Sequence, residues 1–404
     1  MSLCSEKMNH IGSDIRGKNF FVSLEMEKRG EKVLKLNTGN PATFGFGMPD
    51  SVRQALIENM DKAVGYCDVR CMVPAREAIY NYQRTKNFYN FTMDNIFVGN
   101  GVSEIASMLT TALINPGDEV LVPTPCYSLW TNEVILHSGK PVFYKCDEAN
   151  GWNPDTEHIK SLITPKTKAI LVINPNNPTG VLYSEDTLKE IVEIARQNNL
   201  IILSDEIYDR LVFDGKKHVS TASLAEDLIV ITMNGLSKSH CLCGFRCGWL
   251  VVSGPEKERT EICDALMKIA SIRLSANALM QTIIPAALDD FDYTNAMIAP
   301  GGRLYEQRKA TCEELDKIEA ISYVKNDASF YIFPKIDPEM LPIENDKEFA
   351  HELLLDKHIL IVPGSGFMWD TTDHFRIVML PEPEELATAV REMGDFISKK
   401  IAQR

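Results

Sequence analysis

Lys238 follows an apolar segment, where a charged side chain is unfavourable unless it has a chemical role. It ends the run GLSK, which follows the Ile- and Val-rich segment 228–234. An amine at the end of a buried strand is suited to attack a carbonyl carbon. Ser237 beside it and Arg246 further on offer a hydroxyl and a planar guanidinium, both good donors to a phosphate. The alternative is that Lys238 lies in an ordinary loop.

Two more segments place polar side chains after apolar runs. Asp205 ends the run LIILSD, and a carboxylate there is costly unless it meets a cation or several donors. Tyr208 follows at helical spacing and shares its side of the turn. Asn177 belongs to NPNNPTG (174–180), a turn rich in Pro, Asn and Gly. Each has a simpler interpretation, Asp205 as a helix N-cap and NPNNPTG as a plain turn.

A further candidate is an anion site at the start of a helix. Gly101, Val102 and Ser103 follow the apolar run NIFVG and begin the segment GVSEIASMLTTAL. Backbone N–H groups and the helix dipole favour an anion at such a start. By itself this pattern is a weak signal.

Together these side chains match one cofactor, pyridoxal phosphate. It needs an amine for its aldehyde, an acid against its ring nitrogen, donors to its phenolate oxygen and a cradle for its phosphate. Lys238 supplies the amine, Asp205 the acid, and Asn177 with Tyr208 the phenolate donors. The candidate phosphate cradle consists of Gly101, Val102, Ser103, Ser237 and Arg246.

The elements that position these residues are short apolar segments alternating with helix-length ones. Seven segments rich in Val, Ile and Leu lack strict alternation, as strands buried on both faces do. They are NIFVG (95–99), EVLVPT (119–124), PVFYK (141–145), AILVIN (169–174), LIILSD (200–205), LIVITMN (228–234) and GWLVVS (248–253). Between two of them, the amphipathic segment 184–199 has Ser184 and Asn199 as caps. The pattern predicts an α/β fold whose mostly parallel sheet binds ligands at its carboxyl edge.

The chain beyond about residue 300 has a different pattern. A long helix, a short strand (329–336), a second helix and the runs ILIVPG and HFRIVML predict a smaller α+β domain. Pro300-Gly301-Gly302 marks the junction. A length of 404 residues also favours two domains.

Composition narrows the class of protein. The net charge of −14 argues against nucleic acid or an anionic membrane as partners, and no apolar run is long enough to span a bilayer. The N-terminus lacks the apolar core of a secretory signal, and the ten cysteines are scattered like reduced thiols, so we expect a cytoplasmic protein. His240, Cys241, Cys243 and Cys247 have no second Cys pair, so we expect no metal.

The motifs also resemble those of a known family. NPNNPTG, SDEIYDRLVFDG and NGLSKSHCLCGFRCGWL, in this order and spacing, are similar to the class I aminotransferases of PLP fold type I, over about residues 33 to 395. The stretches KIASIRLSANALMQTIIPAAL, GGRLYEQR and DHFRIVMLP resemble the bacterial alanine aminotransferase group. The resemblance implies a large cofactor domain (51–299) with a mostly parallel seven-stranded sheet. A small C-terminal domain (300–404) would be joined by the N-terminal segment 1–50.

The resemblance implies further roles. Tyr127 would stack on the cofactor ring, and Arg376 would bind the substrate α-carboxylate, with Gly39 and Asn177 also against the substrate. Tyr66 would reach the phosphate of a neighbouring subunit, which makes the protein a homodimer with shared active sites. One position departs from the family pattern, because Gly235 stands where a phosphate-binding Ser is common.

The expected activity is a ping-pong transamination between an L-amino acid and a 2-oxo acid. Lys238 would move the proton at the substrate α-carbon. The resemblance favours alanine as donor and 2-oxoglutarate as acceptor, and we identify no residue that reads a side-chain carboxylate. The alternatives are a carbon–sulfur β-lyase on the same scaffold, a non-catalytic PLP-sensing regulatory domain, and an inactive α/β protein.

Overall fold

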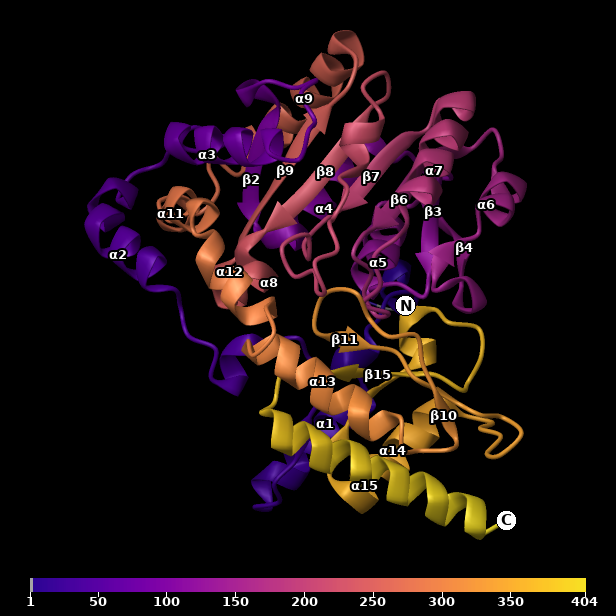
Figure 1. The fold of residues 1–404 in the computed structure, drawn as a ribbon. Coiled ribbons are helices and arrows are strands. Elements are labelled where there is room, and N and C mark those ends of the chain that lie inside the picture. The colour runs from indigo at the N-terminus through magenta and orange to yellow at the C-terminus, as the bar shows by residue number, and fades with distance from the viewer. Residues whose placement is uncertain (1–2) are drawn as a thin grey trace.

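The computed structural model describes residues 3–404, and its centre is a mostly parallel sheet (Figure 1). The strands are β2 (Ile96–Asn100), β3 (Glu119–Thr124), β4 (Lys140–Asp147), β5 (Asn153–Pro154), β6 (Thr167–Ile173), β7 (Ile201–Asp205), β8 (Val230–Gly235) and β9 (Cys247–Ser253). Their order is β2-β9-β8-β7-β6-β3-β4-β5. Strands β3, β4, β6, β7 and β8 run parallel, and β2, β5 and β9 each pair antiparallel. The α/β prediction and all seven predicted strands are confirmed; the eighth strand, β5, has only two residues and no apolar run.

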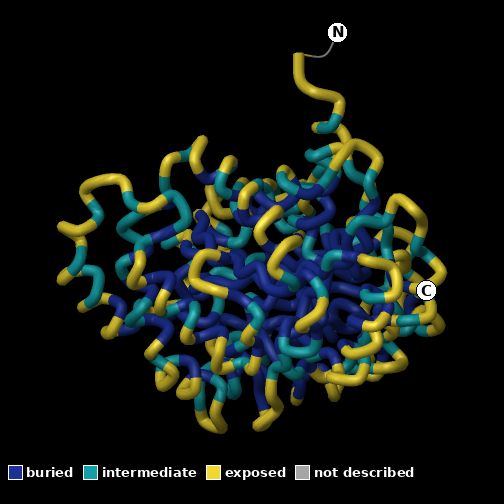
Figure 2. Tube along the Cα trace, turned by 90° about the horizontal axis from the view of Figure 1, so that it is seen from above, coloured by how far each residue is buried: buried dark blue, intermediate teal, exposed yellow. Residues whose placement is uncertain are grey.

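Apolar residues on both sides of each central strand explain why the sheet is internal. On β6, Ile170 and Val172 pack into one hydrophobic cluster, while Leu171 and Ile173 pack into a second cluster on the opposite face. Burying such a side chain contributes about 1.5–3 kcal/mol. Strict alternation of apolar and polar residues is absent because neither face meets water, and Figure 2 shows the buried trace running through the centre.

Helices cover the two faces of the sheet. One face carries α4 (Gly101–Leu113), α5 (Ser128–Leu136) and α9 (Glu256–Ile272). The other carries α3 (Val73–Arg84), α6 (Thr156–Leu162), α7 (Glu185–Asn198) and α11 (Ile284–Asp289). The predicted caps of α7 are confirmed, because Ser184 Oγ accepts the Thr187 N–H at 3.1 Å and Asn199 has a left-handed φ of 51°.

The C-terminal part packs around a separate hydrophobic cluster. Its elements are α13 (Arg303–Leu315), β10 (Ile321–Ser322), β11 (Tyr331–Ile332), β12 (Lys335–Ile336), α14 (Asp346–Lys357), β13 (Ile359–Leu360), β14 (Val362–Pro363), β15 (Phe375–Val378) and α15 (Pro383–Ala402). The single strand predicted over 329–336 is wrong. Pro334 separates β11, which pairs with β15, from β12, which pairs with β10, because proline has no N–H to continue a ladder.

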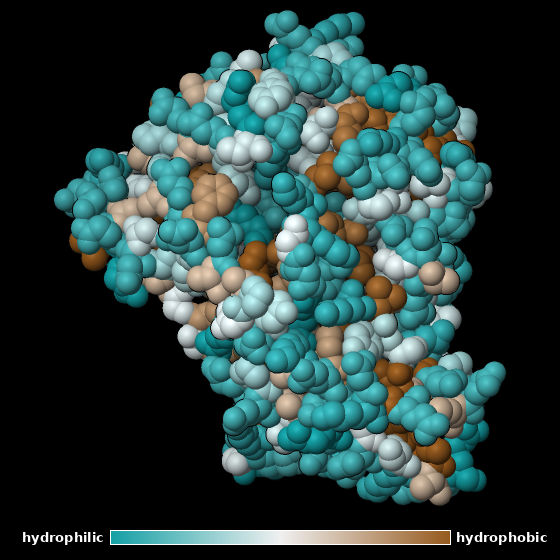
Figure 3. Space-filling view, viewed as in Figure 1, coloured by the Kyte–Doolittle hydropathy of each residue, from teal (hydrophilic) through white to brown (hydrophobic). Residues whose placement is uncertain are grey.

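The N-terminal residues lie against this C-terminal part. Helix α1 (Lys18–Lys28) contacts α14 (Figure 1). Strand β1 (Leu34–Lys35) pairs in parallel with β13. The remaining helices are α2 (Asp50–Asn59), α8 (Leu236–Ser239), α10 (Ala278–Gln281) and α12 (Phe291–Ile298). No helix among residues 3–404 is long and apolar enough to cross a membrane. The face in Figure 3 is mostly hydrophilic, with small separate apolar patches.

Candidate active site

A cavity of about 770 Å³ lies at the carboxyl edge of the sheet, where strands β6, β7 and β8 end side by side. The predicted site residues that line it are Gly39, Val102, Ser103, Tyr127, Asn177, Asp205, Tyr208, Ser237, Lys238, Arg246 and Arg376. Gly101 lies directly beneath the Arg246 guanidinium. Residues more than 300 positions apart thus meet in one cavity, which a parallel sheet makes possible because its strand ends share an edge.

Asp205 is a buried acid with few partners. It ends β7, and its carboxylate accepts hydrogen bonds from Trp130 Nε1 at 2.9 Å and from the Ile207 N–H at 3.3 Å. Burial raises its pKa to about 6, and the nearby Glu206 charge acts in the same direction. A cation placed opposite this carboxylate would reverse that shift, so the site is prepared for a positively charged group.

The Lys238 amine is held at the opening between the sheet and the N-terminal segment. Its Nζ donates to the Gly39 carbonyl at 2.8 Å. Gly39 has no room for a side chain, since a Cβ there would lie 2.2 Å from the Tyr331 hydroxyl. The absence of a side chain lets the N-terminal backbone pass directly over the amine.

Tyr208 and Tyr331 form a buried hydroxyl pair. Tyr208 donates to the Tyr331 oxygen at 3.0 Å, and their rings meet edge to face at 5.6 Å. Burial holds the pKa of Tyr208 well above its ordinary value, so it is a hydrogen-bond donor at neutral pH. Tyr331 belongs to β11, so the C-terminal part of the chain supplies one wall of the cavity.

Arg376 is a fully buried cation that meets only uncharged acceptors. Its Nη1 donates to Asn177 Oδ1 at 2.9 Å and its Nη2 to the Asn37 carbonyl, while Nε has no partner. The guanidinium lies between the rings of Tyr331 (4.5 Å) and Phe367 (4.7 Å). No carboxylate in the described part of the chain pairs with it, and burial lowers its pKa. A buried charge of this kind is expensive unless a ligand supplies the counter-charge.

The candidate phosphate cradle is built by close backbone packing. Gly101 begins α4 with a φ of +76°, and a Cβ there would lie 2.3 Å from Arg246 Nη2. Gly248 packs equally closely, since its Cβ would lie 2.6 Å from the Val102 nitrogen. Arg246 donates to the carbonyls of Cys243 (2.9 Å) and Asn100 (3.3 Å), which fixes the guanidinium over the helix start. The start of α4 and the Arg246 guanidinium therefore lie next to each other, an arrangement that favours an anion.

The presence of glycine at position 235, where a serine is common in the family, has a steric cause. Gly235 pairs with Gly248 across β8 and β9, and a Cβ on Gly235 would lie 2.5 Å from the Cys247 carbonyl oxygen. A serine does not fit there without moving β9. Ser237, two residues further on, lines the cavity and carries a hydroxyl.

Tyr66 is the predicted site residue that lies apart from the cavity of this chain. It is 83% exposed in the segment between α2 and α3 and is absent from the cavity lining. Its predicted contact with a neighbouring subunit remains a prediction.

Several cavity residues escaped the sequence interpretation. Tyr331 carried no motif, and Arg16 comes from the N-terminal segment. Trp130, in the first turn of α5, lies outside the cavity lining and reaches Asp205 from there. Arg16 could have been found by asking which cations near the N-terminus lack an acidic neighbour at helical spacing. Other lining residues are Ser13, Ile15, Thr38, Asn40, Ala42, Leu129, Ile173, Ile207, Cys243 and Gly244.

Three residues of the His and Cys cluster near Lys238, namely His240, Cys241 and Cys247, are buried in the core, whereas Cys243 lines the cavity. His240 stacks on Tyr293 at 6.1 Å, and burial raises the pKa of the Cys241 and Cys247 thiols to about 12. Within residues 3–404, no three His, Cys, Asp or Glu side chains lie close enough together to hold a metal ion.

The residues present fit pyridoxal phosphate. The cradle leaves no space for side chains at Gly101 and Gly248, which an anion against backbone N–H groups requires. The desolvated Asp205 suits a protonated ring nitrogen, and Lys238 lines the same cavity.

Comparison with known proteins supports the same conclusion. The family profile "Aminotransferase class I and II" matches residues 31–393. The chain is 46% identical to the glutamate-pyruvate aminotransferase AlaA of Haemophilus influenzae, covering 98% of both chains. It is 41% identical to an alanine aminotransferase of Mycobacterium tuberculosis, covering 97% of this chain and 92% of the relative.

Solved aminotransferase structures have the same fold as this chain. An Escherichia coli aminotransferase superposes with a TM-score of 0.96 at 45% identity over 98% of both chains. The alanine aminotransferase of Pyrococcus furiosus gives 0.93 at 38% identity over 98% of this chain and 100% of that one. The chain belongs to the class I and II aminotransferases and is a pyridoxal-phosphate-dependent transaminase.

Proposed function

We propose that this transaminase exchanges L-alanine and pyruvate with L-glutamate and 2-oxoglutarate. The observation that carries the proposal is the buried Arg376 guanidinium with no carboxylate partner in the described chain. Both substrate pairs bring an α-carboxylate that a guanidinium binds in a bidentate pair. The relatives named for glutamate-pyruvate and alanine transamination support this choice of substrates.

The proposed cofactor contacts follow from the cavity. Lys238 would form the covalent link, Asp205 would pair with the ring nitrogen, Tyr127 would pack on the ring, and Asn177 and Tyr208 would donate to the phenolate oxygen. Gly101, Val102, Ser103, Ser237 and Arg246 hold the phosphate. When bound, the cofactor accepts the amino group and stabilises the electron pair left at the α-carbon.

The chain's own groups then bind the substrate and move a proton. Arg376 binds the α-carboxylate, with Asn177 and the Gly39 backbone on either side. This pairing orients the α-carbon toward Lys238, whose amine is free to take up and return the proton at Nζ. Asp205, once paired with a cation, has its pKa lowered and stays ionised throughout.

Arg16 supports glutamate as one of the two amino acids. It lines the cavity and forms no ion pair within the described chain, so the cavity contains a cation besides Arg376 that the proposed cofactor contacts of Lys238 and Arg246 leave unused. We propose that Arg16 binds the distal carboxylate of glutamate and that alanine leaves it unused. Arg16→Gln should raise KM for glutamate about tenfold and KM for alanine less than about twofold. Lys18→Gln, an exposed cation outside the cavity lining, is the control; equal effects on both substrates would reject the role of Arg16.

The function is tested by the visible absorption of the purified protein. L-Alanine should bleach the yellow band and 2-oxoglutarate should restore it, while Lys238→Ala should lack the band. If L-cysteine alone reacts, releasing pyruvate, ammonia and sulfide, the β-lyase alternative replaces the proposal. A protein that stays colourless with added pyridoxal phosphate overturns it.

We also propose that two copies complete each other's sites through Tyr66. Tyr66 is accompanied by a run of exposed apolar side chains, of which Val64 is 88% exposed, and such runs mark interfaces. The other exposed members are Ile57, Met60 and Val73. Mixing Lys238→Ala with Tyr66→Ala subunits should restore activity, because one site of each mixed dimer is wild type. Self-contained sites would give no recovery.

We also propose the domain bounds and the cellular location of the protein. The cofactor domain spans 51–299, and residues 1–50 join 300–404, which the pairing of β1 with β13 supports. A cytoplasmic location agrees with buried free thiols such as Cys126 and Cys146.

A further inference from the structure

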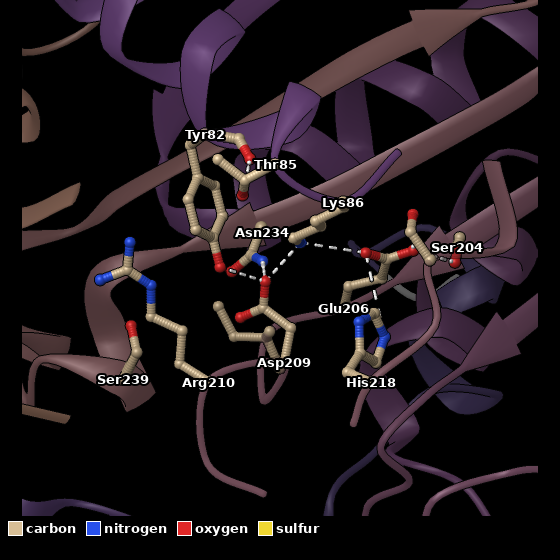
Figure 4. A network of polar contacts seen from close by, with 12 residues as sticks. Tyr82, Thr85, Lys86, Ser204, Glu206, Asp209, Arg210, His218, Asn234 and Ser239 are labelled. Carbon is tan, nitrogen blue, oxygen red and sulfur yellow. Dashed lines mark hydrogen bonds and ion pairs between the residues drawn. The ribbon is translucent and has the colours of Figure 1, made fainter. Parts of the chain in front are cut away.

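Figure 4 shows a polar network whose central residues lie outside the cavity lining. Its centre is Lys86, just past the end of α3, whose ammonium lies between the carboxylates of Glu206 and Asp209. The Lys86–Glu206 distance is 3.2 Å, and the Lys86–Asp209 contact is shorter still. The side chains of Glu206 and Asp209 are 0% and 3% exposed.

Each carboxylate also has uncharged donors. Glu206 Oε1 accepts from Ser204 at 3.1 Å and from Ser220 at 2.7 Å. Asp209 Oδ2 accepts from Tyr82 at 2.6 Å and from Asn234 at 2.7 Å. With these donors the network is well satisfied, and a satisfied buried network holds its members rigidly.

The turn 205–209 presents its side chains in two directions. Asp205 and Tyr208 line the cavity, whereas Glu206 and Asp209 lie outside its lining and meet Lys86. The Lys86 ammonium therefore binds both Glu206 and Asp209, on the side of the turn that faces away from the cavity. The distance and angle between the Asp205 carboxylate and the Tyr208 hydroxyl depend on this turn keeping its shape.

The same network joins the three strand ends that carry the site. Asn234, which bonds Asp209, lies on β8 just before Lys238. His218 Nε2 donates to the carbonyl of Asn174, at the end of β6, and lies 3.9 Å from Glu206. The segments carrying Asn177, Tyr208 and Lys238 are thus fixed to one another through Glu206 and Asp209.

A neutral side chain cannot replace Lys86, because the two carboxylates need a positive charge between them. Burial lowers the pKa of His218, so this ring is neutral at pH 7. Arg210 stacks on Tyr82 at 4.5 Å and donates to the carbonyls of Ala287, Leu288 and Asp290, away from the two carboxylates. Without Lys86, Glu206 and Asp209 would repel each other across the turn.

We propose that Lys86 is a positioning residue for the cofactor ring, because it clamps Glu206 to Asp209 and so fixes Asp205 and Tyr208 against it. The proposal rests on the proposed roles of Asp205 and Tyr208. The wild-type absorption experiment tests those roles, and only the comparison of Lys86 variants tests the clamp.

The test uses Lys86→Met in the full-length protein. Titration of the apoprotein with pyridoxal phosphate, followed by tryptophan fluorescence since Trp130 touches Asp205, should show a Kd at least about tenfold higher. In the loaded enzyme kcat should fall about 100-fold while KM for alanine changes less than about threefold, because Arg376 is untouched. The pH midpoint of the visible band should move in the same direction as in Tyr208→Phe.

Two further variants separate positioning from general stability. Lys140→Met removes the ion pair between an exposed lysine and the buried Glu119 at the opposite ends of the strands and should leave cofactor affinity unchanged. Lys86→Met/Asp209→Asn keeps the wild-type net charge of the network and should recover thermal stability but not cofactor affinity or kcat. Recovery of all three in the double variant overturns the clamp, as does a wild-type cofactor Kd in Lys86→Met.

Discussion

Arg308 and Arg376 are buried to nearly the same degree, yet they have opposite surroundings. Arg308 on α13 donates to both oxygens of Asp214 at 2.7 and 2.8 Å and stacks on Phe213 at 4.2 Å. Arg376 stacks on aromatic rings in the same way but meets only an amide oxygen and a carbonyl. The difference lies in the counter-charge that Arg376 lacks, and because Arg376 lines the cavity, a ligand bound there can supply it.

The carboxylates of the turn 205–209 show the same contrast. Asp209 faces away from the cavity, where Lys86 and two uncharged donors hold its pKa below the ordinary value. Asp205 faces the cavity, and burial raises its pKa to about 6. In both comparisons the ion outside the cavity meets an opposite charge, and the ion that lines the cavity does not. Each unpaired ion is a cost that the fold tolerates and that a ligand removes.

Removal of the unpaired arginine should have the largest effect on activity. Arg376→Met should lower kcat/KM for alanine about 1000-fold, which equals about 4 kcal/mol, mainly through KM because the carboxylate is bound before and during the reaction. Apoprotein thermal stability should not fall, since an uncompensated buried charge disappears. Steady-state kinetics and thermal unfolding check both parts. A destabilised variant with normal KM would mean that Arg376 is structural.

Asp205→Asn should stabilise the apoprotein while abolishing transamination. The folded pKa of about 6 lies above the ordinary 3.8, so ionised Asp205 costs stability above pH 6 and nothing below about 3.8. The variant should gain about 3 kcal/mol at pH 8, and the gain should shrink as pH falls below 6. Urea unfolding at several pH values measures it. A gain that is independent of pH would show that the charge is not its source.

Most of the site residues predicted from the sequence line one cavity because they follow strands, and buried strands are recognisable by composition. Lys238, Asp205 and Asn177 each stand just after an apolar run, and all three line the cavity. Tyr331 was missed because only its contact with Tyr208 indicates that it belongs to the site. That contact joins residues 123 positions apart. Pairing of this kind depends on how β11 docks, which local composition does not record.

The same limit applies to fine structure. Two-residue strands such as β5 and β12 carry too few residues for a periodic pattern. The reason for glycine at Gly235 was also invisible, because it lies in the facing strand: Cys247 and Gly248 leave no space for a Cβ. The network around Lys86 escaped because a lysine after a helix is ordinary until Glu206 and Asp209 are seen on either side.

The paired arginine should behave in the opposite way to Arg376. Arg308→Met should lower the free energy of unfolding by about 2 kcal/mol, because the bond to Asp214 and the donation to the Asn326 carbonyl at 3.1 Å are lost. The value stays moderate since Asp214 is partly exposed and returns to water. KM and kcat of the folded enzyme should equal those of wild type. A raised KM for alanine would break the distinction between the two arginines.

A paired arginine at the surface should matter least. Arg196 binds Asp227 at 2.6 and 2.8 Å and Glu193 at 2.5 Å, with geometry as good as that of Arg308. Water competes for all three charges, so Arg196→Met should change the free energy of unfolding by less than about 0.5 kcal/mol and leave activity unchanged. Urea unfolding at low and high salt checks this. If Arg196→Met destabilised the protein as much as Arg308→Met, the bond to an acid rather than burial would set the contribution of an arginine to stability. The missing partner of Arg376 would then no longer imply an energetic cost.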